Sequence, residues 1–412
     1  MNRGIQAIRW WRLLWLGPVS VIAVANFSGC DRIAPIPLPE IEATQSGQQS
    51  VEKSASNIAT SDDDRVGHAP AQRPAIDVGS QSNGAPTYGE PQGALLLRID
   101  RVLANGLSER RLSSEDNAAW QIMHGVICYG HDLPLQTPDL GLVPALDYAF
   151  HGGMIRGWQL KPGDILPSGR RGVKALLEPG SYTGQGHVDQ WIAICAMADL
   201  PESDKVVLEG ETMTLRDWAE QARWDACTNP LNEASWTLIA LTHYFPEDAQ
   251  WTASDGSTWS WERMVADEVR YDLTLSPCGG SHRLVGLARA LEAKQRLKLA
   301  DSQIWDEARR IVERSVSDIQ DMRSGDGSLS SHYLERPGSS RDLGLTLAST
   351  GHLLEFLAVG LPTRDLKQPW VAAAAARLCE IFEATRTADL DCGACYHGLN
   401  GLRVYRARLA RT

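Results

Sequence analysis

Residues 353–359 of this chain read LLEFLAV, whereas residues 302–323 read SQIWDEARRIVERSVSDIQDMR. In the first stretch apolar side chains fall on every side of a helix, so that helix must be covered all round by other parts of the protein. In the second stretch they recur every three to four residues, which is typical of a helix with one buried face and one face in water. The chain therefore contains two kinds of helix, apolar helices and amphipathic helices.

Both kinds of helix alternate along the chain beyond residue 92. Apolar helices are expected near Trp120, Trp191, Trp236, Leu284, Leu354 and Leu402. Amphipathic helices are expected over 214–227, 257–273, 302–323 and 368–385. The apolar helices follow one another at intervals of roughly 45 to 70 residues, and repetition at such intervals is typical of stacked helical hairpins.

We therefore expect an all-α fold, an α/α toroid of about six hairpins. In this fold the apolar helices form an inner ring and the amphipathic helices an outer ring. An open superhelical solenoid of the same hairpins is the alternative. The closed ring is favoured because the convex helices of a solenoid would not leave one set of helices so uniformly apolar.

The composition of the 412 residues limits the class of protein. Hydrophobic residues make up 43% of the chain, which is enough to bury a large core and excludes a wholly disordered or collagen-like protein. The net charge is −11. A surface that tracks phosphates over the whole molecule would need the opposite sign, so we expect no nucleic acid partner.

The N-terminal stretch has the pattern of an export signal. Three arginines precede an apolar run at 13–27, which is too short to span a membrane and contains a proline. The run closes on the sequence FSGC at 27–30, which resembles the bacterial lipobox. This resemblance implies a signal peptide over 1–29 and lipidation of Cys30. We therefore expect a protein of the cell envelope that a lipid anchors to a membrane and that faces the periplasm or the exterior.

Two further regions follow the signal segment. Residues 30–92 are dominated by Pro, Ser, Gln, Asp and Gly, with almost no aromatic side chains, and we interpret them as a disordered tether. Residues 93–412 contain all the helical periodicity and form the predicted toroid domain. Within it, residues 152–186 interrupt the helical pattern with several glycines and prolines. We expect this insertion to cover the mouth of the ring as a lid.

Histidines and carboxylates stand at the predicted starts of the apolar helices. In a ring the inner helices all run the same way, so their N-termini meet at one rim and present free N–H groups there. The candidate site residues at this rim are His187, Asp189, Glu233, His282, His352 and His397, and His124 belongs to the remaining apolar helix. Imidazoles held neutral at such a rim suit a base, an acceptor or a metal ligand.

Three functions are compatible with this rim. The first is binding of an unidentified small molecule or polysaccharide in a concave site between helices, with no chemical step. The second is a carbohydrate-active hydrolase or lyase, for which Asp189 and Glu233 are the candidate pair of carboxylates. The third is an interaction scaffold, which would show an exposed apolar patch on its outer helices. The sequence leaves open whether the protein is an enzyme.

Gln320, followed by the sequence DGSL at 326–329, resembles a repeat of the α/α-toroid superfamily of terpenoid cyclases and protein prenyltransferases. This resemblance implies the double ring of helices. It also implies a zinc site, because Asp225 and Cys227, with His282 farther along, are similar to the zinc ligands of prenyltransferase β subunits. Three such ligands would leave a fourth position open for substrate.

The sequence offers other readings of its cysteines. Cys395 and His397 are similar to the zinc-binding signature of lanthionine synthetase cyclases, which is a second route to zinc. Structural thiols or disulfides at the rim are the plainer interpretation, because an exported protein meets oxidising conditions. The sequences CGGSH at 278–282 and TGH at 350–352 also look like those of exported bacterial proteins of the planctomycete type.

Overall fold

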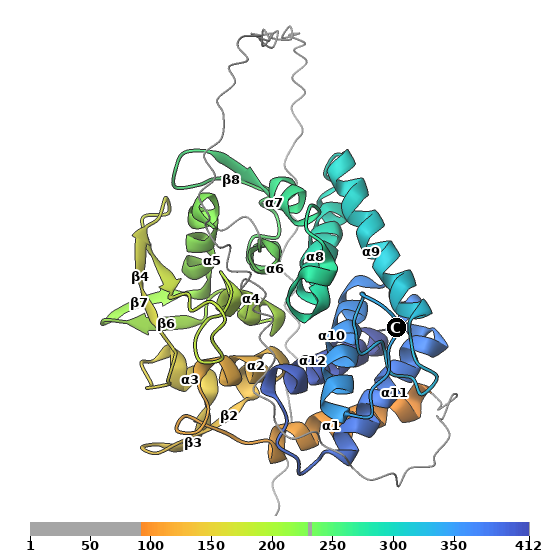
Figure 1. The fold of residues 1–412 in the computed structure, drawn as a ribbon. Coiled ribbons are helices and arrows are strands. Elements are labelled where there is room, and N and C mark those ends of the chain that lie inside the picture. The colour runs from red at the N-terminus through yellow and green to blue at the C-terminus, as the bar shows by residue number, and fades with distance from the viewer. Residues whose placement is uncertain (1–91, 230–232, 412) are drawn as a thin grey trace, which may run out of the picture. The chain divides into compact units, whose positions relative to one another are not determined.

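The computed structural model describes residues 92–229 and 233–411 (Figure 1). The predicted signal peptide, Cys30 and nearly all of the predicted tether lie outside the described residues. Those that are described form twelve α-helices and nine short strands. The mostly helical fold expected from the sequence is therefore confirmed.

The helices are α1 (Gln92–Glu109), α2 (Ala119–Tyr129), α3 (Ala145–Phe150), α4 (Gln190–Met197), α5 (Leu215–Trp224), α6 (Ser235–Tyr244), α7 (Trp261–Glu268), α8 (Ser281–Leu297), α9 (Gln303–Asp321), α10 (Leu343–Gly360), α11 (Pro369–Ala384) and α12 (Cys392–Ala410). The strands are β1 (Leu112–Ser113), β2 (Pro134–Thr137), β3 (Gly141–Pro144), β4 (Leu160–Ile165), β5 (Arg171–Ala175), β6 (Lys205–Leu208), β7 (Glu211–Thr214), β8 (Gln250–Thr252) and β9 (Thr258–Ser260).

The even-numbered helices pack against one another in a continuous series. Helix α2 contacts α4, and the series continues through α6, α8 and α10 to α12, which contacts α2 again. These are the six helices predicted to be apolar all round. All eight residues of α4 and nine of the ten residues of α6 are buried. The apolar pattern therefore identified the helices that neighbours cover on every side.

Odd-numbered helices pack against the helices of this series. Helix α5 contacts α4 and α6, α9 contacts α8 and α10, and α11 contacts α10 and α12. Figure 1 shows α5 and α9 on either side of α6 and α8. The amphipathic stretch at 302–323 forms α9 with Trp305, Ala308, Val312 and Ile319 buried, as its periodicity predicts.

The prediction that the fold is all-α was wrong in one respect, because short β-hairpins connect helices. The pairs β2–β3, β6–β7 and β8–β9 each join an even-numbered helix to the next odd-numbered one. Turns with left-handed backbone close them, at Glu209 and Gly210 and at Gly256. Strands of three or four residues are too short to leave a pattern of alternating side chains, so the sequence did not reveal them.

The same hairpins start the outer helices. Strand β7 ends at Thr214, whose hydroxyl accepts from the backbone N–H of Asp217 and caps α5. The side chain of Asp217 accepts in turn from the backbone N–H of Thr214, so the two residues form a capping box. Strand β9 ends at Ser260, which caps α7 in the same way. Because β9 occupies the start of the predicted 257–273 helix, α7 begins later than expected, at Trp261.

Arginines of α12 bind the carbonyl groups at the C-terminal ends of its neighbours. Arg403 donates to the carbonyl oxygens of Ile127 in α2, at 3.4 Å, and Met197 in α4, at 3.0 Å. Arg408 donates to two carbonyl oxygens in the last turn of α10. Helix C-termini leave carbonyls without intrahelical partners, and cations are favoured there. These contacts link α12 to three of the other inner helices.

Helices α10 and α12 approach closely through glycines. A Cβ at Gly351 would lie 2.8 Å from the Cα of Gly398, and one at Gly401 would lie 2.9 Å from the backbone nitrogen of Glu355. Both distances are shorter than real Cβ atoms adopt. The two backbones can therefore meet only because these positions have no side chain.

Among the described residues, α10 alone is long and apolar enough to span a membrane, and 67% of that stretch is buried inside the protein. Its neighbours α8, α11 and α12 cover it. The apolarity of α10 is thus accounted for by its place among the inner helices.

Replacement of Gly351 by alanine tests the close contact between α10 and α12. Helix propensity alone would stabilise the protein by up to about 1 kcal/mol. Because the new methyl group meets the backbone of Gly398, we expect instead a loss of about 2–3 kcal/mol in the free energy of unfolding, measured in urea. Gly93→Ala in α1 is the matched control, since nothing lies within 4 Å of that position. Equal effects of the two substitutions would contradict this account.

Candidate functional site

Four histidines from four of the even-numbered helices form an imidazole cluster, which we define as His124 of α2, His282 of α8, His352 of α10 and His397 of α12. The ring of His397 lies 4.2 Å from that of His352, 4.8 Å from that of His282 and 5.3 Å from that of His124, centre to centre. The rings of His282 and His352 are 5.3 Å apart. The structure therefore brings together residues that are up to 273 positions apart in the sequence.

Hydrogen bonds orient three of these rings in the same way. The Nδ1 atoms of His124 and His352 donate to the carbonyl oxygens four residues earlier, at 2.6 Å and 2.7 Å. The Nδ1 of His397 donates to Oε2 of Glu355 at 2.8 Å. Carbonyl oxygens only accept, so the neutral rings of His124 and His352 carry the hydrogen on Nδ1 and the lone pair on Nε2.

Burial keeps the cluster neutral. It lowers the pKa of His124 to about 4 and also lowers the pKa of His352. The pKa values of His282 and His397 fall well below the usual range, first through burial and then through repulsion by the neighbouring imidazoles. A neutral imidazole has a lone pair on one ring nitrogen, and this is the form that binds metal ions.

Two ring nitrogens of the cluster are buried without a partner. The Nε2 atoms of His282 and His397 make no hydrogen bond within the described part of the chain. His282 is 8% exposed and His397 is 1% exposed. A buried nitrogen without a partner costs free energy unless something else binds it, and so these atoms mark a place for a ligand.

A buried network of hydrogen bonds holds the His397 ring in its orientation. Glu355 is fully buried in α10, and its Oε1 accepts from the side-chain amide of Asn400 at 2.6 Å. The amide oxygen of Asn400 in turn accepts from Arg403 at 2.9 Å. Burial raises the pKa of Glu355 to about 7. Glu355 orients the His397 ring as carboxylates often orient metal-binding histidines.

The loop before α8 places a thiol next to the cluster. Cys278, Gly279 and Gly280 all have left-handed backbone, with φ values of 52°, 59° and 75°. A Cβ at Gly279 would lie 2.3 Å from the side chain of Tyr333, so the tyrosine packs directly on this loop. The Tyr333 ring lies 6.2 Å from that of His352. This conformation, which is unfavourable for a cysteine, turns the chain into α8 beside the imidazoles.

Two sets of side chains in this region could hold a metal ion. Cys278, His282 and His352 form one set, and His282, Glu355 and His397 form the other. In each set the potential ligand atoms lie within 4.8 Å of one another. The sets share His282, so they are alternatives for one ion or a site for two ions.

His187 and Glu233 form a separate pair near the cluster. The Nδ1 of His187 lies 2.6 Å from Oε2 of Glu233. Trp236 stacks on His187 with ring centres 5.7 Å apart and also contacts His282 at 4.6 Å. Asp189 has a different partner, because its carboxylate accepts from the hydroxyl of Thr237 at 2.6 Å. The two carboxylates expected to work together therefore bind different groups.

The expected places of the histidines within their helices need correction. His187 precedes α4 and His282 is the second residue of α8, as predicted for helix starts. His352, however, lies in the middle of α10, and His397 lies in the second turn of α12. Both helices start earlier than their apolar pattern indicated. The helix dipole therefore does not account for the neutrality of these two rings, which burial explains instead.

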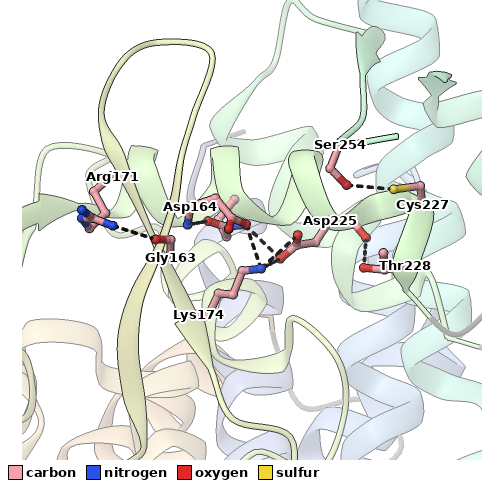
Figure 2. Close-up of polar contacts among 9 residues, drawn as sticks. Gly163, Asp164, Arg171, Lys174, Asp225, Cys227, Thr228 and Ser254 are labelled. Atoms are coloured by element: carbon pink, nitrogen blue, oxygen red, sulfur yellow. Dashed lines mark hydrogen bonds and ion pairs between the residues drawn. The ribbon is translucent and has the colours of Figure 1, made fainter. Parts of the chain in front are cut away.

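The expected zinc ligands Asp225, Cys227 and His282 do not come together. Asp225 binds Lys174 and Gln221, and the thiol of Cys227 lies 3.1 Å from the hydroxyl of Ser254 (Figure 2). Neither residue belongs to a set of potential ligands with His282 in the described ranges. The reason is that residues 225–228 form a short 3-10 helix after α5, and their side chains turn toward the β4–β5 hairpin and the β8–β9 turn.

Two other interpretations of the cysteines were disulfides at the rim and a second zinc site at Cys395 and His397. None of the seven cysteines between residues 92 and 411 is in a disulfide, so the rim disulfides are not formed among the described residues. Cys395 is 3% exposed, and burial raises its pKa to about 12. It belongs to neither set of potential metal ligands, so the second expected route to zinc is not assembled.

The predicted lid packs over the start of α2. The carbonyl oxygens of Arg156 and Thr183 accept from the N–H groups of Ala119 and Trp120, which begin that helix. Tyr182 contacts Trp120, whose ring lies 4.0 Å from that of His124. The insertion thus binds N–H groups that a helix start leaves free and covers one side of the cluster.

Sequence reasoning missed Glu355, Asn400 and the role of Cys278. A signal existed for the first two, because a single carboxylate in the run LLEFLAV and an amide in α12 are buried polar groups in otherwise covered helices. Buried polar groups need partners, and such partners often serve a site. Cys278 was noted only as a thiol near the rim, since nothing local shows the loop that brings it to His282.

Comparisons with known proteins give no family model that matches the chain, no matching curated protein and no matching solved structure. The functional conclusion therefore depends on the site itself.

Asp189→Asn tests the burial of the Asp189 carboxylate. Burial raises the pKa of Asp189 to about 6, whereas in the unfolded chain it is about 3.9. The unfolded chain ionises first, so this group lowers stability as the pH rises from about 4 to about 6. We expect the variant to gain roughly 1–2 kcal/mol in urea unfolding at pH 8 and nothing at pH 4. Asparagine also tolerates the left-handed backbone of this position, with φ of 57°.

The exposed Asp139→Asn is the matched control and should change nothing at either pH. A gain for Asp189→Asn that is equal at pH 4 and pH 8 would show that ionisation is not its cause.

Proposed function

We propose that this protein binds a divalent transition-metal ion, zinc, in its imidazole cluster. The observation that carries the proposal is the meeting of the Cys278 thiol with His282 and His352 within 4.8 Å. Thiolate sulfur and imidazole nitrogen are the ligands that zinc prefers in proteins. This set of ligands differs from Asp225, Cys227 and His282, which the resemblance to prenyltransferases implied.

The environment of these residues supports the same ion. The His352 ring is fixed by its bond to Ala348, which leaves Nε2 free, and the Nε2 of His282 is buried without a partner. Burial raises the pKa of the Cys278 thiol to about 12, so an ion that binds there must displace a proton. Hard cations such as magnesium prefer oxygen ligands and do not suit this set.

We also propose that the inner helices form the closed ring of an α/α toroid. Support comes from the contact of α12 with α2, which completes the series of inner helices, and from the bonds of Arg403 to α2 and α4. In such a ring all inner helices run in one direction, so their N-terminal halves share one end. Such an arrangement would explain how four helices that are distant in the sequence contribute to the imidazole cluster.

The cellular setting is a proposal from the sequence. The apolar run at 13–27 and the lipobox-like sequence before Cys30 support export and lipid anchoring at the cell envelope, with the toroid facing the periplasm or the exterior. A membrane would then be a partner through the anchor alone.

Cleavage of a carbohydrate, as by a hydrolase or a lyase, is the second candidate function. The observation in its favour is the pKa of Asp189, which burial raises to about 6 and which would suit a general acid. Glu233 would act as the other carboxylate. This function predicts that Asp189→Asn abolishes cleavage of a polysaccharide while zinc binding is unchanged.

Metal analysis of the purified, tag-free protein tests the proposed function. After exposure to equimolar zinc and extensive dialysis, we expect about one zinc per chain by mass spectrometry. Cys278→Ser and His352→Ala should retain less than about a tenth of an equivalent, because each removes a ligand. His151→Ala, which changes an exposed histidine outside the cluster, is the matched control and should bind zinc normally.

Glu355→Gln and Cys278→Ser together distinguish the two sets of ligands. If Cys278, His282 and His352 bind the ion, then Glu355→Gln should weaken zinc binding only about 10- to 100-fold, as loss of a supporting hydrogen bond does. If His282, Glu355 and His397 bind it, Cys278→Ser should keep its zinc. Wild-type protein with no zinc would refute the proposal.

A further inference from the structure

The proposed metal site has three protein ligands, whereas zinc takes four ligands. His397 lies beside it, but in the described ranges no set of potential ligands contains both His397 and His352. Their ring centres are 4.2 Å apart, and the ring planes are tilted by 31°. Sites with three protein ligands keep a position for water or substrate and are typical of catalytic zinc.

His187 and Glu233 form a pair near the proposed zinc ligands. In the neutral ring Nδ1 donates to Glu233, so Nε2 is left to accept a proton. Both side chains are partly open, 24% and 23% exposed, whereas His282 is 8% exposed. Only the ring of Trp236 separates His187 from the ligand His282. A histidine that is held by a carboxylate, is partly exposed and contacts the same tryptophan as a proposed metal ligand has the arrangement of a general base.

The charges around the pair indicate an uncharged substrate. Glu233 and Asp189 are both acidic, and Arg283, the cation at the start of α8, is bound to Glu268 and Ser276. A phosphate or sulfate ester would meet carboxylates here and no available cation from the described residues. A neutral carbonyl compound needs no such cation, because a metal ion can stabilise the developing oxyanion.

We propose that His187 is the catalytic base of a metal-assisted hydrolase that cleaves uncharged carboxylic esters or amides, with Glu233 as its positioning residue. This inference rests on the proposed zinc site. A bound zinc ion would polarise the carbonyl oxygen and lower the pKa of a coordinated water to about 7.

The residues of the chain then move one proton. Nε2 of His187 takes a proton from the water while the water oxygen bonds to the carbonyl carbon. The bond from this carbon to the leaving oxygen or nitrogen then breaks, and His187 returns the proton to the leaving atom. The products are a carboxylic acid and an alcohol or amine, and no oxidant, reductant or other reactant is consumed.

Binding of acetohydroxamate tests the open position without any substrate. This chelator binds zinc only where protein ligands leave room for it. We expect the zinc-loaded full-length protein to bind it in titration calorimetry, and the zinc-free protein to show at least tenfold weaker binding. Zinc-loaded protein that does not bind acetohydroxamate would overturn the inference and leave the proposed zinc binding intact. Absence of zinc would overturn both.

Hydrolysis of 4-nitrophenyl acetate tests the pair itself. At equal zinc content, we expect His187→Ala to lower kcat about 100-fold or more, the usual loss for a general base. Glu233→Gln should lower kcat about tenfold with KM unchanged, and Glu233→Asp should restore part of the loss. Glu247→Gln, at an exposed position, is the matched control and should act like wild type.

Other outcomes would overturn the assignment of the pair. No zinc-dependent hydrolysis by wild type, or equal rates for wild type and His187→Ala, would exclude His187 as the base. Loss of zinc from His187→Ala would make His187 a ligand. A change in KM alone for Glu233→Gln would show that Glu233 binds substrate and does not position His187.

Discussion

The contact between α10 and α12 is the constraint on which the rest of the site depends. The backbone of Gly351 meets that of Gly398 at a distance that a side chain at Gly351 would prevent. The residues next to these glycines in the sequence are His352 and His397, so the same contact sets their rings 4.2 Å apart. Gly401 allows the same approach one turn later, beside Glu355. Small residues thus bring two helices together, and the helices bring two imidazoles and a carboxylate together.

Burial of the imidazole cluster costs the protein folding free energy. Neutral imidazoles and a carboxylate are removed from water, and the bonds to Glu355, Asn400 and Arg403 recover only part of the lost hydration. Two nitrogens have no partner among the described residues. Arg403 also binds the ends of α2 and α4, so the network that orients His397 continues into the bonds that connect the inner helices. The structural and functional roles of α12 are therefore coupled, and an ion would compensate for the remaining cost.

Much of the fold could be predicted, because helix type depends on local periodicity. The apolar runs identified the inner helices, and the amphipathic runs identified α5, α9 and α11, since a helix displays its buried face every 3.6 residues. The short hairpins could not be predicted from strands of three or four residues, and they shortened α7. The candidate site was predicted in part: His282, His352 and His397 do meet, whereas Asp225 and Cys227 face another part of the molecule.

By itself, the sequence determined which segments are helices, which of them are covered on all sides, and which histidines they carry. These properties follow from side chains within a few turns of one another. Only the tertiary structure decided that the thiol of Cys278, and not that of Cys227, joins the imidazoles, and that Glu355 orients His397. Those contacts depend on how each helix is rotated about its axis and where each loop turns. Both are set by packing between segments far apart in the chain, at glycines whose neighbours local sequence does not reveal.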